Sequence, residues 1–129
     1  MIYLDASALV KLVVREAESE ALFRYLGSRP ARISSALSQV EVVRALRRSD
    51  RQQSDLERAA RALDRVALVP IDDTVLRSAA RIEPTALRSL DSIHLATALT
   101  LPPLDAFVAY DDRLIEGARQ LGCEVVSPD

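Results

Sequence analysis

Cysteine and histidine are almost absent from this chain, and each scarcity excludes a class of site. A single cysteine, Cys123, cannot form an intrachain disulfide. With one histidine, His94, the chain also lacks the several sulfur and nitrogen ligands that a zinc site usually needs. The neighbours of Cys123 indicate a turn entering a strand, so we expect a buried, inert thiol rather than a nucleophile.

Long apolar runs are missing as well. The uninterrupted apolar stretches are far shorter than the roughly 20 residues of a membrane-spanning helix, and the first residues show no signal-peptide pattern. We therefore expect a cytoplasmic protein with no membrane contact. Its 129 residues, of which 49% are hydrophobic, suffice for one core, and we expect a single domain spanning residues 1–129.

The charge balance is nearly even, and its distribution says more than its sum. The formal net charge of −2 does not by itself indicate a nucleic-acid binder, and Lys11 is the only lysine among 17 Lys and Arg residues. If four acids bind a metal together, the rest of the chain is left with a net positive charge. An acidic site in a mildly basic surface suits an enzyme that handles phosphates, although an ordinary solvated surface has the same composition.

Short apolar runs alternate with helical patterns along the whole chain. The runs predict strands at residues 2–4, 31–34, 66–71, 106–109 and 124–126. The helical patterns predict helices at residues 8–15, 19–26, 37–48, 54–65, 72–82, 90–99 and 112–121. We assign caps to Ser7 and Ser54. Short strands that alternate with helices imply an α/β fold with a parallel sheet covered on both faces.

Four carboxylates fall where such a fold collects functional groups. Asp5 and Asp111 each follow a predicted strand, and sites in α/β folds lie outside the carboxyl ends of the strands. Asp91 opens a predicted helix, and Glu41 lies on the side of its helix away from the main apolar face. Taken singly, each has a simpler explanation: a turn residue, a helix cap or a surface glutamate.

As a set, the four acids indicate a metal site. Carboxylates that converge at one sheet edge repel one another, so without a cation they destabilise the fold or take raised pKa values. Oxygen ligands without histidine or cysteine suit Mg²⁺ or Mn²⁺. Such ions activate water, aim it at phosphorus and stabilise the leaving oxygen.

Four segments carry a resemblance to a known family. The chain begins with MIYLDASALV, which resembles the opening of PIN-domain proteins, where an aspartate ends the first strand and a serine or threonine follows two residues later. Residues 38–45, SQVEVVRA, resemble the glutamate helix of that family, and residues 107–114, FVAYDDRL, resemble its fourth motif. Residues 87–98, LRSLDSIHLATA, are very similar to the third motif of VapC-type toxins. The motifs occur in order and at family spacing over essentially the whole chain.

The resemblance implies both a fold and a function. The fold is a PIN-like three-layer α/β/α arrangement with a central parallel sheet of about five strands. The function is that of a Mg²⁺- or Mn²⁺-dependent endoribonuclease whose RNA products carry a 5′-phosphate and a 3′-hydroxyl. Such an enzyme acts as the toxin of a toxin–antitoxin pair, is held silent by a VapB-like antitoxin encoded beside it, and usually forms a homodimer.

The resemblance also assigns residues by their position in the motifs. The four acids of the site would be Asp5, Asp91, Asp111 and Glu41. The three aspartates would be metal ligands, and Glu41 would be a ligand or the partner of a metal-bound water. Ser7 would orient Asp5, and Asp112 is a lower-ranked substitute for Asp111. Ala109 stands where the family often has a threonine. His94, three residues after Asp91, is interpreted as a packed helix residue rather than a general base.

Several alternatives and partners stay open. A non-catalytic PIN-like scaffold would bind RNA or protein without cutting it. A phosphoacceptor receiver domain would need a lysine late in the chain, and a phosphatase of the haloacid-dehalogenase type would need a second aspartate at the position of Ser7. Candidate contacts to an RNA backbone are Arg44, Arg47, Arg48 and Arg51, and candidate apolar dimer contacts are Leu22, Phe23, Leu26, Leu37 and Val40. The sequence does not identify the target RNA.

Overall fold

The structure is a computed structural model that describes residues 1–49 and 52–129. One parallel sheet holds its strands in the order β3-β2-β1-β4-β5, which are β1 Ile2–Leu4, β2 Arg32–Ser35, β3 Ala67–Val69, β4 Ala106–Val108 and β5 Val125–Val126. The helices are α1 Ala6–Val13, α2 Ser19–Gly27, α3 Ser38–Arg48, α4 Gln53–Leu63, α5 Asp73–Ala79, α6 Ser89–Leu99 and α7 Asp112–Gln120. Among the helices of these two ranges, none is long and apolar enough to cross a membrane. The predicted α/β/α fold is confirmed.

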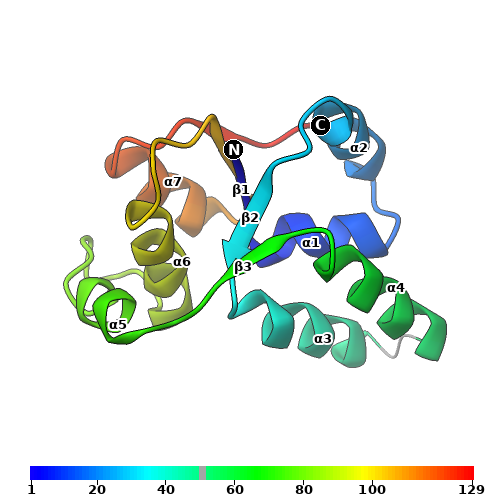
Figure 1. The fold of residues 1–129 in the computed structure, drawn as a ribbon, viewed down its shortest axis with the longest axis horizontal. Helices are drawn as coiled ribbons and strands as arrows, with labels where there is room; N and C mark the ends of the chain where they lie inside the picture. The colour runs from blue at the N-terminus through cyan, green and yellow to red at the C-terminus, as the bar shows by residue number, and fades with distance from the viewer. Residues whose placement is uncertain (50–51) are drawn as a thin grey trace.

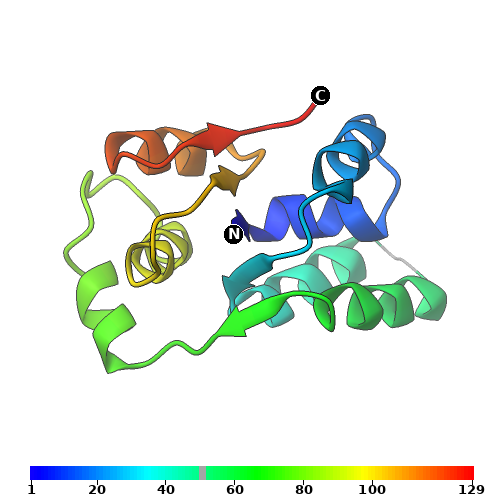
Figure 2. The ribbon, with the colours of Figure 1, turned by 45° about the horizontal axis from the view of Figure 1, so that its top comes forward.

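The sheet separates two groups of helices. Helices α1 to α4 lie to one side of it and α5 to α7 to the other, and the turned view keeps the two groups apart (Figures 1 and 2). Side chains alternate accordingly along the central strands, because neighbouring residues of a strand point to opposite faces. Leu4 and Val108 belong to the core beneath α1 to α4, whereas Tyr3 and Phe107 belong to the core shared with α6 and α7.

The strand order brings the carboxyl ends of β1 and β4 together. The chain builds β1, β2 and β3 outward in one direction, then returns to place β4 on the free side of β1. Leu4 is in register with Val108, and the Asp5 amide donates to the Val108 carbonyl at 3.1 Å. This reversal is the topological switch point at which α/β sheets form their ligand crevice.

Two predicted helix caps are wrong. Asp5, not Ser7, caps α1, because its carboxylate accepts the Ala8 amide and the helix already begins one residue after it. The capping box expected at Ser54 is absent, since α4 begins one residue earlier, after Gln52, without a side-chain cap. The Ser7 hydroxyl donates to the Asp5 carboxylate instead of capping the helix.

The predicted dimer contacts separate into core and surface residues. Leu22 and Leu26 are fully buried beneath the sheet, so they were wrongly proposed as exposed contacts. Phe23 and Val40 are 54% and 55% exposed and remain candidates.

Candidate active site at the carboxyl edge of the sheet

Asp5 is a buried carboxylate at the carboxyl end of β1, only 3% exposed. Ser7 Oγ lies 2.7 and 2.8 Å from its two oxygens and donates to them, and the Ala8 amide donates to Oδ1 at 2.9 Å. The Tyr110 amide in turn donates to Ser7 Oγ at 3.0 Å, which ties the loop after β4 to this carboxylate. Burial raises the pKa of Asp5 to about 6, although the hydrogen bonds from Ala8 and Ser7 oppose the rise.

Asp91 lies in the first turn of α6 and is not the helix cap that the sequence suggested. The helix begins at Ser89, and the extended residue before it, Arg88, occupies the cap position. Burial of the half-exposed Asp91 carboxyl raises its pKa, and the negative charge of Asp111 raises it further. The start of α6 and the start of α7 therefore present two carboxylates that repel each other.

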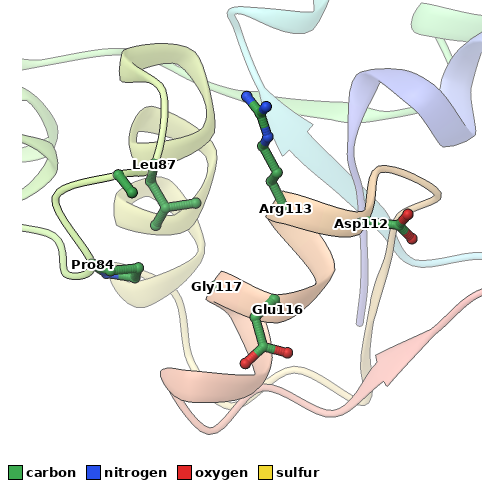
Figure 3. Close-up of a pocket in the computed structure, with 7 residues that line it drawn as sticks. Pro84, Leu87, Asp112, Arg113, Glu116 and Gly117 are labelled. Carbon is green, nitrogen blue, oxygen red and sulfur yellow. The ribbon is translucent and has the colours of Figure 1, made fainter.

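Asp111 and its neighbour Asp112 face different hollows. Asp111 caps α7 by accepting the Leu114 amide at 3.0 Å, and it lines a surface hollow together with Ser7. Asp112 instead lines a hollow of about 490 Å³ whose far wall includes Leu87, from the loop before α6 (Figure 3). Of the two, Asp111 is the residue that shares a hollow with the partner of Asp5.

Glu41 points from α3 into a contact that the sequence did not suggest. Its side chain is 24% exposed, and Oε1 lies 2.5 Å from Nε2 of His94 on α6. The other ring nitrogen, Nδ1, lies 2.8 Å from the hydroxyl of Tyr3 on β1. These contacts join residues 53 and 91 positions apart, which no local pattern of the sequence reveals.

Lys11 is a further charged residue at the site that sequence reasoning missed. It stands one helical turn after Ser7 on α1 and lines the same hollow as Ser7 and Asp111. Its ammonium group is paired with Glu16 and Glu18 at 2.5 and 2.8 Å, so its charge is largely compensated. The four-residue spacing from Ser7 was the available signal, since residues i and i+4 share a helix face.

The acids fit a hard divalent cation in chemistry but are not arranged as a finished ligand cage. Within residues 1–49 and 52–129, no three His, Cys, Asp or Glu side chains stand together as a group that could hold a metal ion. Asp5 is nevertheless a buried carboxylate with a raised pKa, and Asp91 and Asp111 repel each other. Both features are costs that a bound cation would offset, and every candidate donor is an oxygen of the kind that Mg²⁺ and Mn²⁺ prefer.

The helix that carries Glu41 also carries positive charge. Arg44, Arg47 and Arg48 line a shallow hollow at the exposed side of α3. The fourth candidate, Arg51, lies outside the described residues. A cationic face on the helix that carries Glu41 is suited to a polyanionic ligand.

Sequence comparisons connect the chain to one family. A PIN-domain family model matches residues 2–123. The chain is 48% identical to Ribonuclease VapC46 of Mycobacterium tuberculosis over 128 residues, which cover 98% of this chain and 97% of that protein. It is 45% identical to Ribonuclease VapC35 of the same organism over 133 residues, which cover 99% of this chain and 97% of that one.

Solved structures share the fold at lower identity. The crystal structure of Mycobacterium tuberculosis VapC20, a toxin that cleaves the sarcin–ricin loop, superposes with a TM-score of 0.78 at 18% identity and covers 99% of this chain and 100% of that one. A toxin–antitoxin complex from Klebsiella pneumoniae superposes with a TM-score of 0.74 at 19% identity and covers 100% of this chain and 98% of that one. At these identities the likeness concerns the fold.

Proposed function

Because this chain belongs to the PIN-domain family and to its VapC ribonucleases, we propose that it is a metal-dependent endoribonuclease that acts as the toxin of a toxin–antitoxin pair. The observation that carries the proposal is Asp5, a carboxylate buried at the switch point of the sheet with its pKa raised to about 6. A buried acid is costly to the fold, and the repulsion between Asp91 and Asp111 adds a second cost. Such costs are typical of sites that use negative charge.

The acids have distinct roles in this proposal. Asp5, Asp91 and Asp111 hold the cation, Mg²⁺ or Mn²⁺, with Glu41 as a further ligand or as the group that accepts a proton from the attacking water. When bound, the cation supplies the positive charge that activates water and stabilises the leaving oxygen. Ser7 fixes the orientation of Asp5 through its short hydrogen bonds. Asp112 ranks below Asp111, because it lines the other hollow.

The relatives and the surface support the proposed partners. We propose that the chain works as a single PIN domain in the cytoplasm, forms a homodimer and is silenced by a VapB-like antitoxin. The Klebsiella pneumoniae relative is a toxin–antitoxin complex, which supports the antitoxin. The Arg44, Arg47 and Arg48 face would guide the RNA backbone toward Glu41 on the same helix.

The central experiment is RNA cleavage by the purified chain. We expect cleavage with Mg²⁺ or Mn²⁺, none in EDTA, recovery when the ion is added back, and products with a 5′-phosphate and a 3′-hydroxyl. A non-catalytic scaffold would bind RNA in EDTA and in Mg²⁺ alike and leave it intact. Intact RNA after incubation of the metal-loaded, folded chain with total cellular RNA contradicts the proposal.

A growth assay tests the biological role separately from the chemistry. Expression of the chain alone should arrest growth, and co-expression of the protein encoded beside it should relieve the arrest. The neighbour's tail is expected to fold near α3 and present a basic side chain to the acids. Undisturbed growth and intact cellular RNA in cells that hold folded, metal-loaded protein argue against a toxin.

A further inference from the structure

The single histidine of the chain connects the sheet to the candidate site. His94 is 2% exposed, and each of its ring nitrogens has a partner: the Tyr3 hydroxyl at 2.8 Å on Nδ1 and Glu41 Oε1 at 2.5 Å on Nε2. A ring with both nitrogens engaged and almost no exposed surface cannot take a proton from water or from RNA. His94 is therefore not a general base, and its contacts suggest another role.

The partners on the two ring nitrogens fix the direction of one hydrogen bond and the orientation of the ring. A carboxylate only accepts hydrogen bonds, so Nε2 must carry the hydrogen that it donates to Glu41. The Tyr3 hydroxyl lies opposite Nδ1 and can donate to it or accept from it, so the 2.8 Å contact holds the ring in either case. The two contacts together hold the ring with its Nε2–H directed at Glu41.

Tyr3, the member of this hydrogen-bond series that lies in the sheet, is held rigidly. Tyr3 is fully buried on β1, two residues before Asp5, and its ring stacks on that of Phe107 with centroids 4.7 Å apart and planes 10° apart. Its ring also meets the His94 ring edge to face, at 5.9 Å and 87°. The position of Nε2 is therefore set by the two central strands, β1 and β4, which also lead to Asp5 and to Asp111.

We propose that His94, fixed by Tyr3, is a positioning residue that holds Glu41 by one oxygen and leaves the other for the cation or the attacking water. The inference rests on the proposed function and deepens it. Within residues 1–49 and 52–129, the hydrogen bond to His94 is the one that engages the Glu41 carboxylate. Without it, Glu41 would be a partly exposed side chain on a helix face, free to change rotamer.

Because the chain has one histidine, the hydrogen on its Nε2 can be observed directly. The imidazole ¹⁵N resonances of the metal-free wild type should show a hydrogen on Nε2. Tyr3→Phe keeps the stacked ring but removes the hydroxyl, and it should shift the Nδ1 resonance. A wild-type Nε2 without a hydrogen overturns the hydrogen bond donated to Glu41, and a Tyr3→Phe spectrum identical to wild type overturns the role of the tyrosine.

The second measurement is Mn²⁺ affinity, by calorimetry on the full chain. Removal of a group that orients a ligand typically weakens metal binding or activity by about 10- to 100-fold, and we expect this of His94→Leu. His94→Gln should recover part of the loss, because its amide nitrogen can still donate to Glu41. Ser19→Ala is the matched control: it removes a buried hydroxyl that bonds the Lys11 carbonyl and does not touch Glu41, and it should bind Mn²⁺ as wild type does.

The outcomes separate this inference from the function on which it rests. If wild type binds Mn²⁺ and cleaves RNA, and folded His94→Leu matches it in both, the positioning role is wrong while the ribonuclease stands. If wild type neither binds Mn²⁺ nor cleaves, the proposed function fails, and the positioning role toward a cation fails with it, whatever the ¹⁵N spectra show. If His94→Leu does not fold, Tyr3→Phe decides: unchanged affinity overturns the inference, and a weaker affinity at an unchanged melting temperature supports it.

Discussion

At the scale of single residues, Asp5 serves both the fold and the candidate site, and its burial costs stability. Its carboxylate caps α1 and is buried beside Ser7, yet that burial raises its pKa to about 6 from the ordinary 3.8. A raised pKa means that the folded state binds this proton more tightly than the unfolded state. Burial of Asp5 therefore does not lower the free energy of unfolding below about pH 4, where the carboxyl is protonated. The loss of stability grows as the pH rises to about 6.

Asp5→Asn should consequently stabilise the metal-free protein, and only above the acid range. Asparagine can still accept the Ala8 amide through its oxygen, so the cap survives. A shift of one pKa unit corresponds to about 1.4 kcal/mol, so we expect the variant to be about 1 to 3 kcal/mol more stable at pH 7 and equal to wild type near pH 4. Urea unfolding in EDTA at the two pH values measures this. A difference of the same size at both would show that Asp5 carries no such penalty.

Asp91→Asn tests whether the acid on α6 serves a cation. Because Asp91 lies inside the first turn and does not cap α6, its amide should not disturb the helix. RNA cleavage should fall to background, while in EDTA the variant should be at least as stable as wild type, since one of two repelling charges is gone. A ligand at 100 times its Kd stabilises a protein by about 2.7 kcal/mol, and the variant should gain much less than wild type from Mn²⁺.

The control for Asp91→Asn is Asp112→Asn, another acid in the first turn of a helix. It lines the hollow opposite Leu87 and should retain most of the cleavage and of the Mn²⁺ stabilisation. Melting with and without Mn²⁺, beside a cleavage assay, measures both variants. Wild-type cleavage by Asp91→Asn, or a wild type whose melting ignores both Mg²⁺ and Mn²⁺, would remove Asp91 from the metal site.

At the scale of elements, the sequence predicted where most strands and helices lie but not how their ends are made. Apolar runs mark strands and the helical period marks helices, because both patterns are local. Caps depend on which polar group reaches which amide, and the caps predicted at Ser7 and Ser54 are not found. The contact between Glu41 and His94 depends on how α3 and α6 pack over the sheet edge, which no local pattern encodes.

The packing of α7 on α6 is close enough to test by a single methyl group. A Cβ on Gly117 would lie 3.0 Å from Leu95 Cδ1 and 3.1 Å from Leu87 Cδ1, whereas a Cβ on Gly27 would meet nothing within 4 Å. Alanine favours a helix over glycine by up to about 1 kcal/mol. Gly27→Ala should therefore stabilise the protein, and Gly117→Ala should gain less or lose stability, because Leu95 is buried and must move.

Cleavage should distinguish the two variants as well. Displacing α7 from α6 changes the spacing between Asp111 at the start of one helix and Asp91 in the first turn of the other. We expect Gly117→Ala to lose activity and Gly27→Ala to keep it, measured by melting and by RNA cleavage under the same conditions. Equal stabilisation and full activity in both variants would show that cleavage does not depend on the close approach of α7 to α6.

At the scale of the whole molecule, two exposed apolar residues, Phe23 and Val40, are candidates for the centre of a dimer contact. Phe23 lies in two hollows whose charged side chains are mostly cationic. Beside Glu20 they include Arg24, Arg32, Arg58, Arg61 and Arg65. A two-fold dimer places the same patch on both subunits, so a contact centred there would bring like charges together. Val40 lines neither of these hollows. Arg44 follows it by one helical turn on α3, so a contact centred on Val40 brings fewer arginines together, and Val40 is the better candidate.

The dimer prediction is therefore specific to one face. Val40→Asp should shift the protein to monomers, because it buries a charge in the contact, while Phe23→Asp, at a matched exposed fraction of 54% against 55%, should leave a dimer. Sedimentation velocity of wild type and both variants at high micromolar concentration measures the oligomeric state. A monomeric wild type at that concentration rules out the dimer, and dissociation by Phe23→Asp alone would move the contact to α2, where the arginines would then need acidic partners from elsewhere on the second subunit.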